Sequence, residues 1–393
     1  PERQRSVRAT FNSSWARLSE GERQVFMKLA VCRGGFACEA AEVVAGADLR
    51  TLRRLASKSL LQALPSGRYE VHELLRQYGE EKLRQSDEAE AVRQAHSRYY
   101  LAFLTARDED IKGRRQQAGL QEILADFENI RQAWLWAVEQ RQVDGLSRAA
   151  LDCLTNFADM NFSALEAHAL LSQTISAFQP PAGQPPHPLW DQAVVRQQAV
   201  NYILIQPTDH AQIRVILERA RARGDSHEIV HCLIVLFNHF FGIRDYANPV
   251  NDEALALAQV LGDPFFIARA FNNNAFSRLH DLEHRRACLR QSAQIRRAIG
   301  DRGNLCFSLA QLTACLAEAG AFAEAEQVLE EAVRVQHEIG KTPVYIAVLV
   351  FRAQLAFWRG ELDLAAELLQ TGQAFAGGRI YTGFSYHYPA LLS

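Results

Sequence analysis

The stretch that decides the fold covers residues 320–340, which read GAFAEAEQVLEEAVRVQHEIG. It places one helix between two glycines, and glycine readily takes the left-handed conformation that ends a helix. Outward from it, turn-compatible residues recur at spacings of 18 or 20: Gly224, Gly242, Gly262, His280, Gly300, Gly320, Gly340 and Gly360. Each interval has room for one helix and its turn, so the repeating unit is a helix pair of roughly 38–40 residues, a length typical of helical repeats.

Apolar residues keep the same register through these pairs. Leu282, Phe322 and Leu362 are equivalent, and so are Leu289, Leu329 and Leu369. Repeats of this length, made of two helices, form solenoids in which each pair buries its apolar face against its neighbours. The sequence therefore predicts an α-α superhelical solenoid over residues 146–393, irregular to about 223 and regular after that. Five of the twelve prolines fall between residues 179 and 188, which predicts a loop there.

The N-terminal segment, residues 1–85, has a different pattern. Ser19 and Glu22 form a capping box, in which each side chain satisfies a free amide at a helix start. We expect that helix to end at Gly34 and Gly35. Further helices are expected over 38–45 and 48–59 and from His72, with two strands over 61–64 and 68–71 around a Pro-Ser-Gly turn. This order is typical of a winged-helix domain over 1–85, and residues 86–145 form a helical connector.

Composition excludes several protein classes. The 393 residues carry a net charge of −2, which gives no general attraction to nucleic acid or anionic membranes. No apolar run approaches the roughly 18 residues of a membrane helix. Seven cysteines without a Cys-x-x-Cys pair indicate reduced, buried thiols and a cytoplasmic protein. A chain that starts at Pro1 is expected to be cut from a longer one.

Several segments resemble a known family. Residues 320–332 look like the second helix of a tetratricopeptide repeat (TPR). Residues 26–36, 55–61 and 69–76 resemble the winged-helix domain that follows the nucleotide-binding core in STAND (NB-ARC-type) signal-transduction ATPases. Residues 126–137, DFENIRQAWLWA, look like the connector between that domain and the repeats.

This resemblance implies that the chain is the sensor half of a STAND ATPase. In that family a histidine at the start of the last winged-helix helix contacts the β-phosphate of ADP, and His72 occupies this place. The chain has no Gly-x-x-x-x-Gly-Lys-Ser/Thr loop, so no enzyme activity and no cofactor are expected for it. ADP or ATP and magnesium would belong to an upstream nucleotide-binding domain in the intact parent, which would oligomerise only when activated. The alternative for His72 is a helix cap or a packing residue behind the wing.

The resemblance also implies that the repeats bind an activating small molecule, peptide or protein. Asn272, Asn273 and Asn274 are poor helix formers in the middle of a predicted helix. We expect at least one of them, with Arg278, to face the concave groove and bind this ligand. The alternative is hydrogen bonding between neighbouring repeats.

Two weaker patterns point to other functions. Arg50, Arg53 or Arg54, and Lys58 share one face of the third helix, as in a DNA recognition helix, although the same face could dock within the protein. A DNA-binding transcriptional regulator is therefore the runner-up function, and a passive scaffold is the third.

The second pattern is that of a zinc hydrolase. His227, Glu228 and His231 match the zinc-protease spacing, with Glu253 as a conceivable third ligand. Because these residues open a repeat helix, partly exposed histidines without a metal are the expected outcome.

Overall fold

The computed structural model describes residues 11–161, 163–204, 206–239, 244–278, 280–340 and 342–376, without the side chains of 238–239, 244–248 and 376. The predicted turn at Gly242 lies outside these residues. Contacts divide the chain into two compact units, Pro1–Arg107 with Gln121–Ala150, and Asp108–Leu120 with Leu151–Ser393. Within the described ranges, no helix has both the length and the apolar character needed to cross a membrane.

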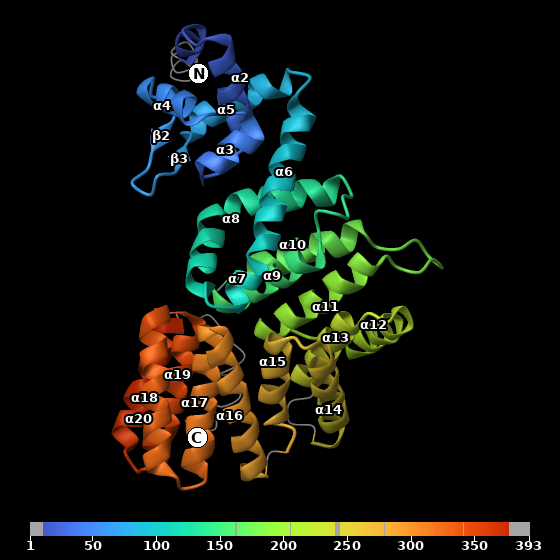
Figure 1. The fold of residues 1–393 in the computed structure, drawn as a ribbon, viewed down its shortest axis with the longest axis vertical. Coiled ribbons are helices and arrows are strands. Elements are labelled where there is room, and N and C mark those ends of the chain that lie inside the picture. Colours follow the sequence, from blue (N-terminus) through green and yellow to red (C-terminus); the bar gives the residue numbers. More distant parts are fainter. Residues whose placement is uncertain are drawn as a thin grey trace. The chain divides into compact units, whose positions relative to one another are not determined.

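The first unit opens with the predicted order of helices and hairpin (Figure 1). Its elements are α2 Glu20–Leu29, β1 Gly35–Phe36, α3 Cys38–Ala45, α4 Leu49–Ser57, β2 Gln62–Ala63, β3 Tyr69–Glu70 and α5 Glu73–Arg84. The capping box of Ser19 and Glu22 is confirmed. Asp48 caps α4 by accepting a hydrogen bond from the Thr51 amide at 2.7 Å.

The prediction around Gly34 and Gly35 is wrong in one respect. Helix α2 already ends at Leu29, and Gly35 enters a third strand, so the sheet has the order β1-β3-β2 with antiparallel pairs. Gly34 has φ +69°, which turns the chain into this strand. Phe36, Leu52 and Leu55 are fully buried and form part of the core under the sheet and helices.

Two long helices complete the first unit. These are α6, Ala89–Ala106, and α8, Gln116–Glu139, whose start, up to Leu120, belongs to the second unit. Tyr100, Leu104 and Trp134 are fully buried between elements of this unit. Residues 86–107 and 121–145 of the predicted connector therefore belong to one compact unit with the segment that precedes them, whereas residues 108–120 belong to the second unit.

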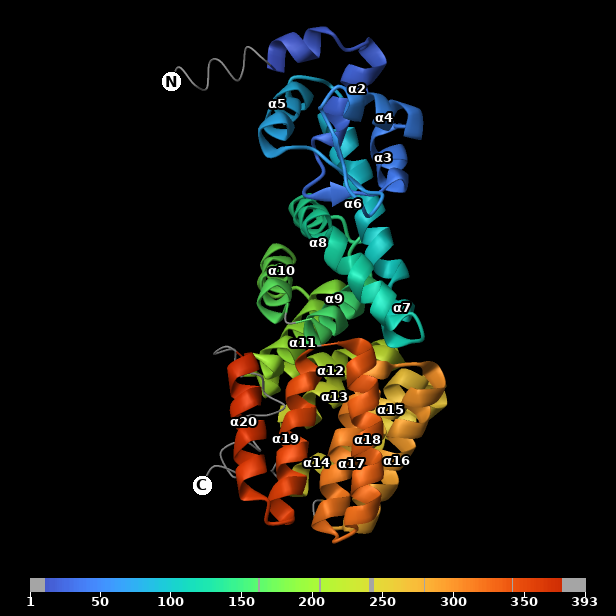
Figure 2. The ribbon, with the colours of Figure 1, turned by 90° about the vertical axis from the view of Figure 1, so that its left-hand side faces the viewer.

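The second unit consists of helices throughout its described part. They are α7 Asp108–Lys112, α9 Arg148–Met160, α10 Ala164–Ala177, α11 Pro188–Ile203, α12 His210–Arg223, α13 Ser226–His239, α14 Arg244–Leu261, α15 Pro264–Asn274, α16 Leu282–Ile299, α17 Arg302–Glu318, α18 Phe322–Ile339, α19 Pro343–Trp358 and α20 Leu362–Ala376. Figures 1 and 2 show α15 to α20 side by side, and each packs mainly on its neighbours in sequence. The predicted α-α superhelical repeat fold is confirmed.

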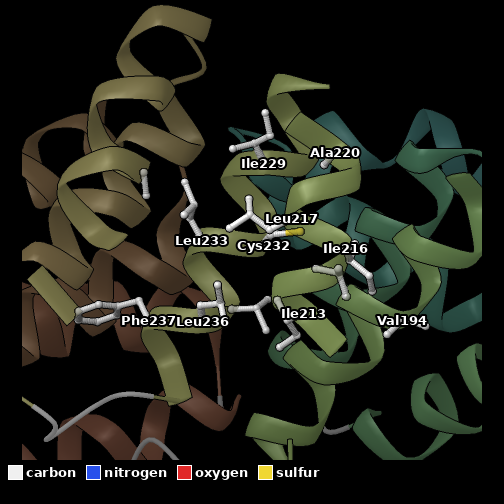
Figure 3. Close-up of a cluster of buried hydrophobic side chains, with 13 residues drawn as sticks. Val194, Ile213, Ile216, Leu217, Ala220, Ile229, Cys232, Leu233, Leu236 and Phe237 are labelled. Atoms are coloured by element: carbon white, nitrogen blue, oxygen red, sulfur yellow. The ribbon is translucent and has the colours of Figure 1, made fainter. Parts of the chain in front are cut away.

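The predicted turn positions are also confirmed where the structure describes them. Gly224, Gly262, Gly300, Gly320, Gly340 and Gly360 all have φ between +67° and +86°. The loop predicted from the prolines lies between α10 and α11. Helices α11 to α13 enclose an aliphatic core that includes Val194, Ile213, Ile216, Leu233 and Leu236 (Figure 3). Each such buried side chain contributes about 1.5–3 kcal/mol to folding.

Candidate functional site

His72 is the N-cap residue of α5. Its Nδ1 accepts a hydrogen bond from the Leu74 amide at 3.4 Å, and its ring is exposed. The imidazole thus stands at the positive end of a helix, where a phosphate is favoured. This helix cap agrees with the alternative interpretation, and the side chain that forms it is exposed to solvent.

The helix that carries His72 is held in place by a buried arginine. Arg76 pairs with Glu73 at 2.8 Å and with Glu80 at 2.7 Å, and it donates to the Ala30 carbonyl at 3.2 Å. The Arg76 guanidinium lowers the pKa of Glu73 to about 2. Because Ala30 ends α2, this arginine fixes the start of α5 against that helix.

A polar clamp joins the hairpin to α8. We use "the clamp" for Arg68 on the hairpin together with Asp126 and Asn129 on α8. Arg68 donates to both carboxylate oxygens of Asp126 at 2.9 and 2.6 Å and to the Gly35 carbonyl at 2.6 Å. Asn129 accepts from the Arg33 amide at 2.7 Å and donates to the Gly35 carbonyl at 3.0 Å. The clamp therefore ties both the hairpin and strand β1 to the connector helix.

His96 on α6 contacts Asn129 of the clamp. Its Nε2 lies 3.4 Å from Asn129 Oδ1, which also accepts from the Arg33 amide. Because an amide oxygen can only accept, Nε2 carries the proton in this bond. Burial lowers the pKa of His96 to about 4, which keeps the ring neutral at physiological pH. Asp126 and Asn129 belong to the stretch 126–137 that resembles the family connector, but the sequence predicted no role for them. Two polar residues among inward-facing apolar ones are the feature of the sequence that could have indicated a buried polar contact.

The basic face of α4 divides into two parts. Arg50, Arg53 and Arg54 are exposed and line a shallow hollow of about 490 Å³, and none of them forms an ion pair with another described residue. Lys58 behaves differently, because its Nζ lies 2.8 Å from both carboxylate oxygens of Glu22. Only the arginines are therefore free to meet an anionic partner.

The prediction that at least one of the three asparagines faces an open groove is wrong. Asn272, Asn273 and Asn274 are all buried, with exposed fractions of 7%, 9% and 5%. Asn272 accepts from Ser308 on the next repeat at 2.9 Å, and Asn274 accepts from Ser277 at 2.7 Å. The first bond links neighbouring repeats, as in the alternative interpretation, whereas the second is local to the end of α15. Arg278 is exposed, but it lies beyond the end of α15 rather than on that helix.

Two residues of the zinc-like pattern, Glu228 and His231, belong to a buried ionic network. Arg196 on α11 donates to Asp152 at 2.8 Å and to Glu228 at 2.5 Å, and all three side chains are buried. His231 Nε2 lies 3.3 Å from Asp152.

Neither candidate carboxylate is available to a metal site. Glu228 serves as a counter-ion in this network, and Glu253 pairs with Arg221 at 2.6 Å. His227 is partly exposed and His231 largely buried, and both rings pack on Phe266. Across the described residues, no group of three His, Cys, Asp or Glu side chains is placed to hold a metal ion.

Comparison with known proteins gives distant relatives. No family model matches the chain. A protein of Mycobacterium bovis and two of Mycobacterium tuberculosis, each named "Putative HTH-type transcriptional regulator", are 26% identical to it over 315 residues. The match covers 78% of this chain and 32% of each relative, so the chain spans about a third of their length.

Two solved structures show a similar arrangement of helices. A STAND protein with a tetratricopeptide repeat sensor from Pyrococcus horikoshii is 15% identical, with a TM-score of 0.44, over 97% of this chain and 67% of that one. A Rap protein complexed with competence and sporulation factor is 15% identical, with a TM-score of 0.49, over 75% of this chain and 97% of that one. With TM-scores below 0.5, both are distant likenesses.

Proposed function

We propose that this chain is the sensor and regulatory part of a STAND-type signalling ATPase. Its first segment acts as a winged-helix domain that holds an upstream nucleotide-binding domain in the ADP-bound resting state. Its TPR-like repeats bind an activating protein or peptide. The observation that carries this proposal is the clamp, because a regulatory winged helix must move as one body with the helix that leads to its sensor.

The clamp supplies that connection through charged and buried groups. Arg68 and Asp126 have exposed side-chain fractions of 18% and 6%, so their pair is shielded from water. Hydrogen bonds between charged groups contribute about 1.5–3 kcal/mol, more than those between neutral groups. A displacement of α8 would therefore also displace the hairpin. Because β3 of the hairpin leads directly into α5, the start of α5 at His72 would move as well.

The experiment is a set of substitutions at His72 in a parent protein that contains the nucleotide-binding domain. His72→Ala should raise basal signalling, because a phosphate contact worth about 1–3 kcal/mol is lost from the resting state. His72→Asp keeps a good helix cap but repels phosphate, so it should raise the output at least as much. If His72 only caps the helix, His72→Asp will behave like the wild type.

His187 provides a matched control. It caps α11 in the same way, with Nδ1 accepting from the Leu189 amide at 3.1 Å. His187→Ala should leave basal output unchanged. Basal output that stays at the wild-type level in both His72 variants, with normal folding, contradicts the proposal.

DNA binding by α4 is the second candidate, favoured by the unpaired arginines and by the names of the mycobacterial relatives. If it is correct, duplex DNA should bind with steep salt dependence, and Arg53→Ala should reduce the slope by about one. Lys58→Ala should change the slope little, because Glu22 already neutralises this lysine. Absence of duplex binding at low salt would exclude this candidate.

A further inference from the structure

Helix α9 crosses the first helices of successive repeats in the second unit. Near its start, Asp152 lies 3.3 Å from Nε2 of His231 on α13. At its end, the sulfur of Met160 lies 3.5 Å from Nε2 of Gln116, which also donates to Asp301 at 2.8 Å. Asp301 is the N-cap residue of α17. Helix α9 therefore extends from α13 to the start of α17, and it passes α15, which contacts α13 and bonds to α17.

The repeat register shows which residue of α15 corresponds to His231. The aspartates that cap α13, α15 and α17 recur at a spacing of 38 residues and are Asp225, Asp263 and Asp301. His231 and Arg269 each follow their capping aspartate by six residues, so they occupy equivalent positions on α13 and α15. Arg269 is therefore the residue of α15 that takes the place of His231 beside α9.

The spacing along α9 matches the spacing of these helices. Asp159 follows Asp152 by seven residues, which is two helical turns or about 10.5 Å along one face. Neighbouring packed helices lie about 8–10 Å apart. Asp159 is thus set towards Arg269 much as Asp152 is set towards His231. The charges of Asp159 and Arg269 do interact with each other, which agrees with this placement.

The two positions differ in how their charges are satisfied. Asp152 is bonded to Arg196 and His231, whereas Asp159 and Arg269 form no hydrogen bond or ion pair with any described residue. We call these two side chains the open pair. Water reaches both of them, since Asp159 is exposed and Arg269 half-buried. Desolvation by the surrounding protein nevertheless raises the pKa of Asp159 and lowers that of Arg269. Charges held in such a place are normally paired.

Other charged groups near the open pair already have hydrogen-bond partners. Arg296 donates to the Asn304 carbonyl at 2.6 Å and to the Ser308 hydroxyl at 2.5 Å. Asp301 accepts from Gln116 at 2.8 Å and from the Asn304 side chain at 2.9 Å. The charges of Arg296 and Asp301 cancel, and so do those of the open pair. A ligand with a single charge would leave one partly desolvated charge uncompensated, which is costly. A zwitterion neutralises both members of the open pair.

We propose that a free α-amino acid binds between the two side chains of the open pair. Its ammonium group donates to the carboxylate of Asp159, which only accepts hydrogen bonds when ionised. Its carboxylate accepts from the guanidinium of Arg269, whose planar fork suits two parallel hydrogen bonds. An α-amino acid carries both charged groups on one carbon atom, as a site with two nearby opposite charges requires. A peptide carries them at opposite ends of its chain.

This inference goes beyond the proposed function and is tested on the chain itself. The probes are the standard α-amino acids, each added alone at about 10 mM, because a ligand that binds only the folded state raises its melting temperature. At least one of them should raise the melting temperature, and calorimetry then measures its Kd. The amide of that amino acid lacks the carboxylate, and its N-acetyl form lacks the ammonium group. Each should bind at least ten-fold more weakly than the free amino acid.

Two substitutions test the residues of the open pair. Asp159→Asn and Arg269→Gln each remove one charge and keep a similar side-chain size, and each should weaken binding at least ten-fold. Arg278→Gln is the matched control, because Arg278 is an exposed arginine just beyond the end of α15, and it should bind as the wild type does. If a variant misfolds, the amide and the N-acetyl form still test the same two contacts on the wild type.

Three results would overturn the inference. The first is that no amino acid stabilises the wild type. The second is that the amide or the N-acetyl form binds as tightly as the free amino acid, which would indicate a simple cation, an anion or a peptide instead. The third is unchanged binding in folded Asp159→Asn or Arg269→Gln. None of these results bears on the His72 experiment, which measures signalling by the parent protein.

Discussion

At the scale of single residues, His96 shows how burial converts a titratable group into a structural one. Its neutral ring donates to Asn129, and burial lowers its pKa to about 4. In the unfolded chain the imidazole has a pKa of about 6.5, so the unfolded state binds more protons between about pH 6.5 and 4. Stability must therefore fall as the pH drops through this window.

The first prediction follows from this shift. Between pH 7.5 and pH 5 the wild type should lose about 2 kcal/mol of unfolding free energy through His96. His96→Gln keeps a hydrogen-bond donor but cannot titrate, so its loss over the same range should be smaller by this amount. Urea unfolding of both proteins at the two pH values measures it. Parallel pH dependence of the two proteins would mean that His96 titrates normally.

Arg196 gives the second residue-scale prediction. Its side chain is 0% exposed, and removing it leaves the Asp152 and Glu228 carboxylates buried without their counter-ion. Arg196→Ala should cost about 3–5 kcal/mol. Arg297→Ala breaks the exposed pair with Glu331 and should cost at most about 1 kcal/mol. Denaturant unfolding compares the two, and equal costs would argue against a buried network.

These residues also show where sequence reasoning reaches its limit. The spacing of His227, Glu228 and His231 says which side chains share a helix face, but not what covers that face. Arg196, on the preceding helix pair, supplies the missing partner of Glu228 and has no recognisable motif of its own. The same holds for Asn272, whose partner Ser308 lies in the next repeat. Local sequence patterns thus identify unusual polar residues, whereas the role of each residue depends on the partner that tertiary packing brings to it.

At the scale of elements, the turns were predictable because one glycine conformation repeats. The regular spacing of turn residues placed every described left-handed glycine from Gly224 onward. Strand β1 was missed because Gly35 and Phe36 are too short a segment for a periodic signal, and they pair with β3, which follows only after two further helices and a strand. The clamp was missed for a similar reason, because Arg68 and Asp126 lie on elements far apart in the chain.

Two of these turn glycines should respond differently to the same substitution. Gly300 has φ +86°, and a Cβ there would lie 2.6–2.9 Å from Arg114, including its backbone atoms. Gly320 has φ +75° with nothing within 4 Å of the added carbon. Gly320→Ala should cost about 1–2 kcal/mol for the left-handed conformation alone. Gly300→Ala should cost a further ~1–3 kcal/mol from overpacking, and thermal unfolding of both variants checks the difference.

At the scale of the whole molecule, the two units differ in how most of their helices pack, although the second unit also holds distant bonds such as that from Gln116 to Asp301. The first unit is closed by bonds between distant segments, such as that from the Arg33 amide to Asn129. The described helices of the second unit pack mainly on their sequence neighbours, as expected for a solenoid. Stability in such an array is a sum of repeat and interface contributions, so a local defect spreads only as far as its neighbours.

This locality predicts how a cavity spreads through the second unit. Leu309 on α17 and Leu369 on α20 are buried to a similar degree, at 2% and 3% exposed, and replacing either by alanine should cost about 2–5 kcal/mol. Because α17 packs on α16, α18 and α19, Leu309→Ala should speed amide hydrogen exchange in all of these helices. Helix α20 packs mainly on α19, so Leu369→Ala should speed exchange in α19 and α20 and leave α15 and α16 unchanged. Hydrogen exchange read by mass spectrometry distinguishes the two patterns. If Leu369→Ala raises exchange uniformly through the described helices of the second unit, then this unit unfolds as one cooperative block, and the repeats cannot respond to a partner one at a time.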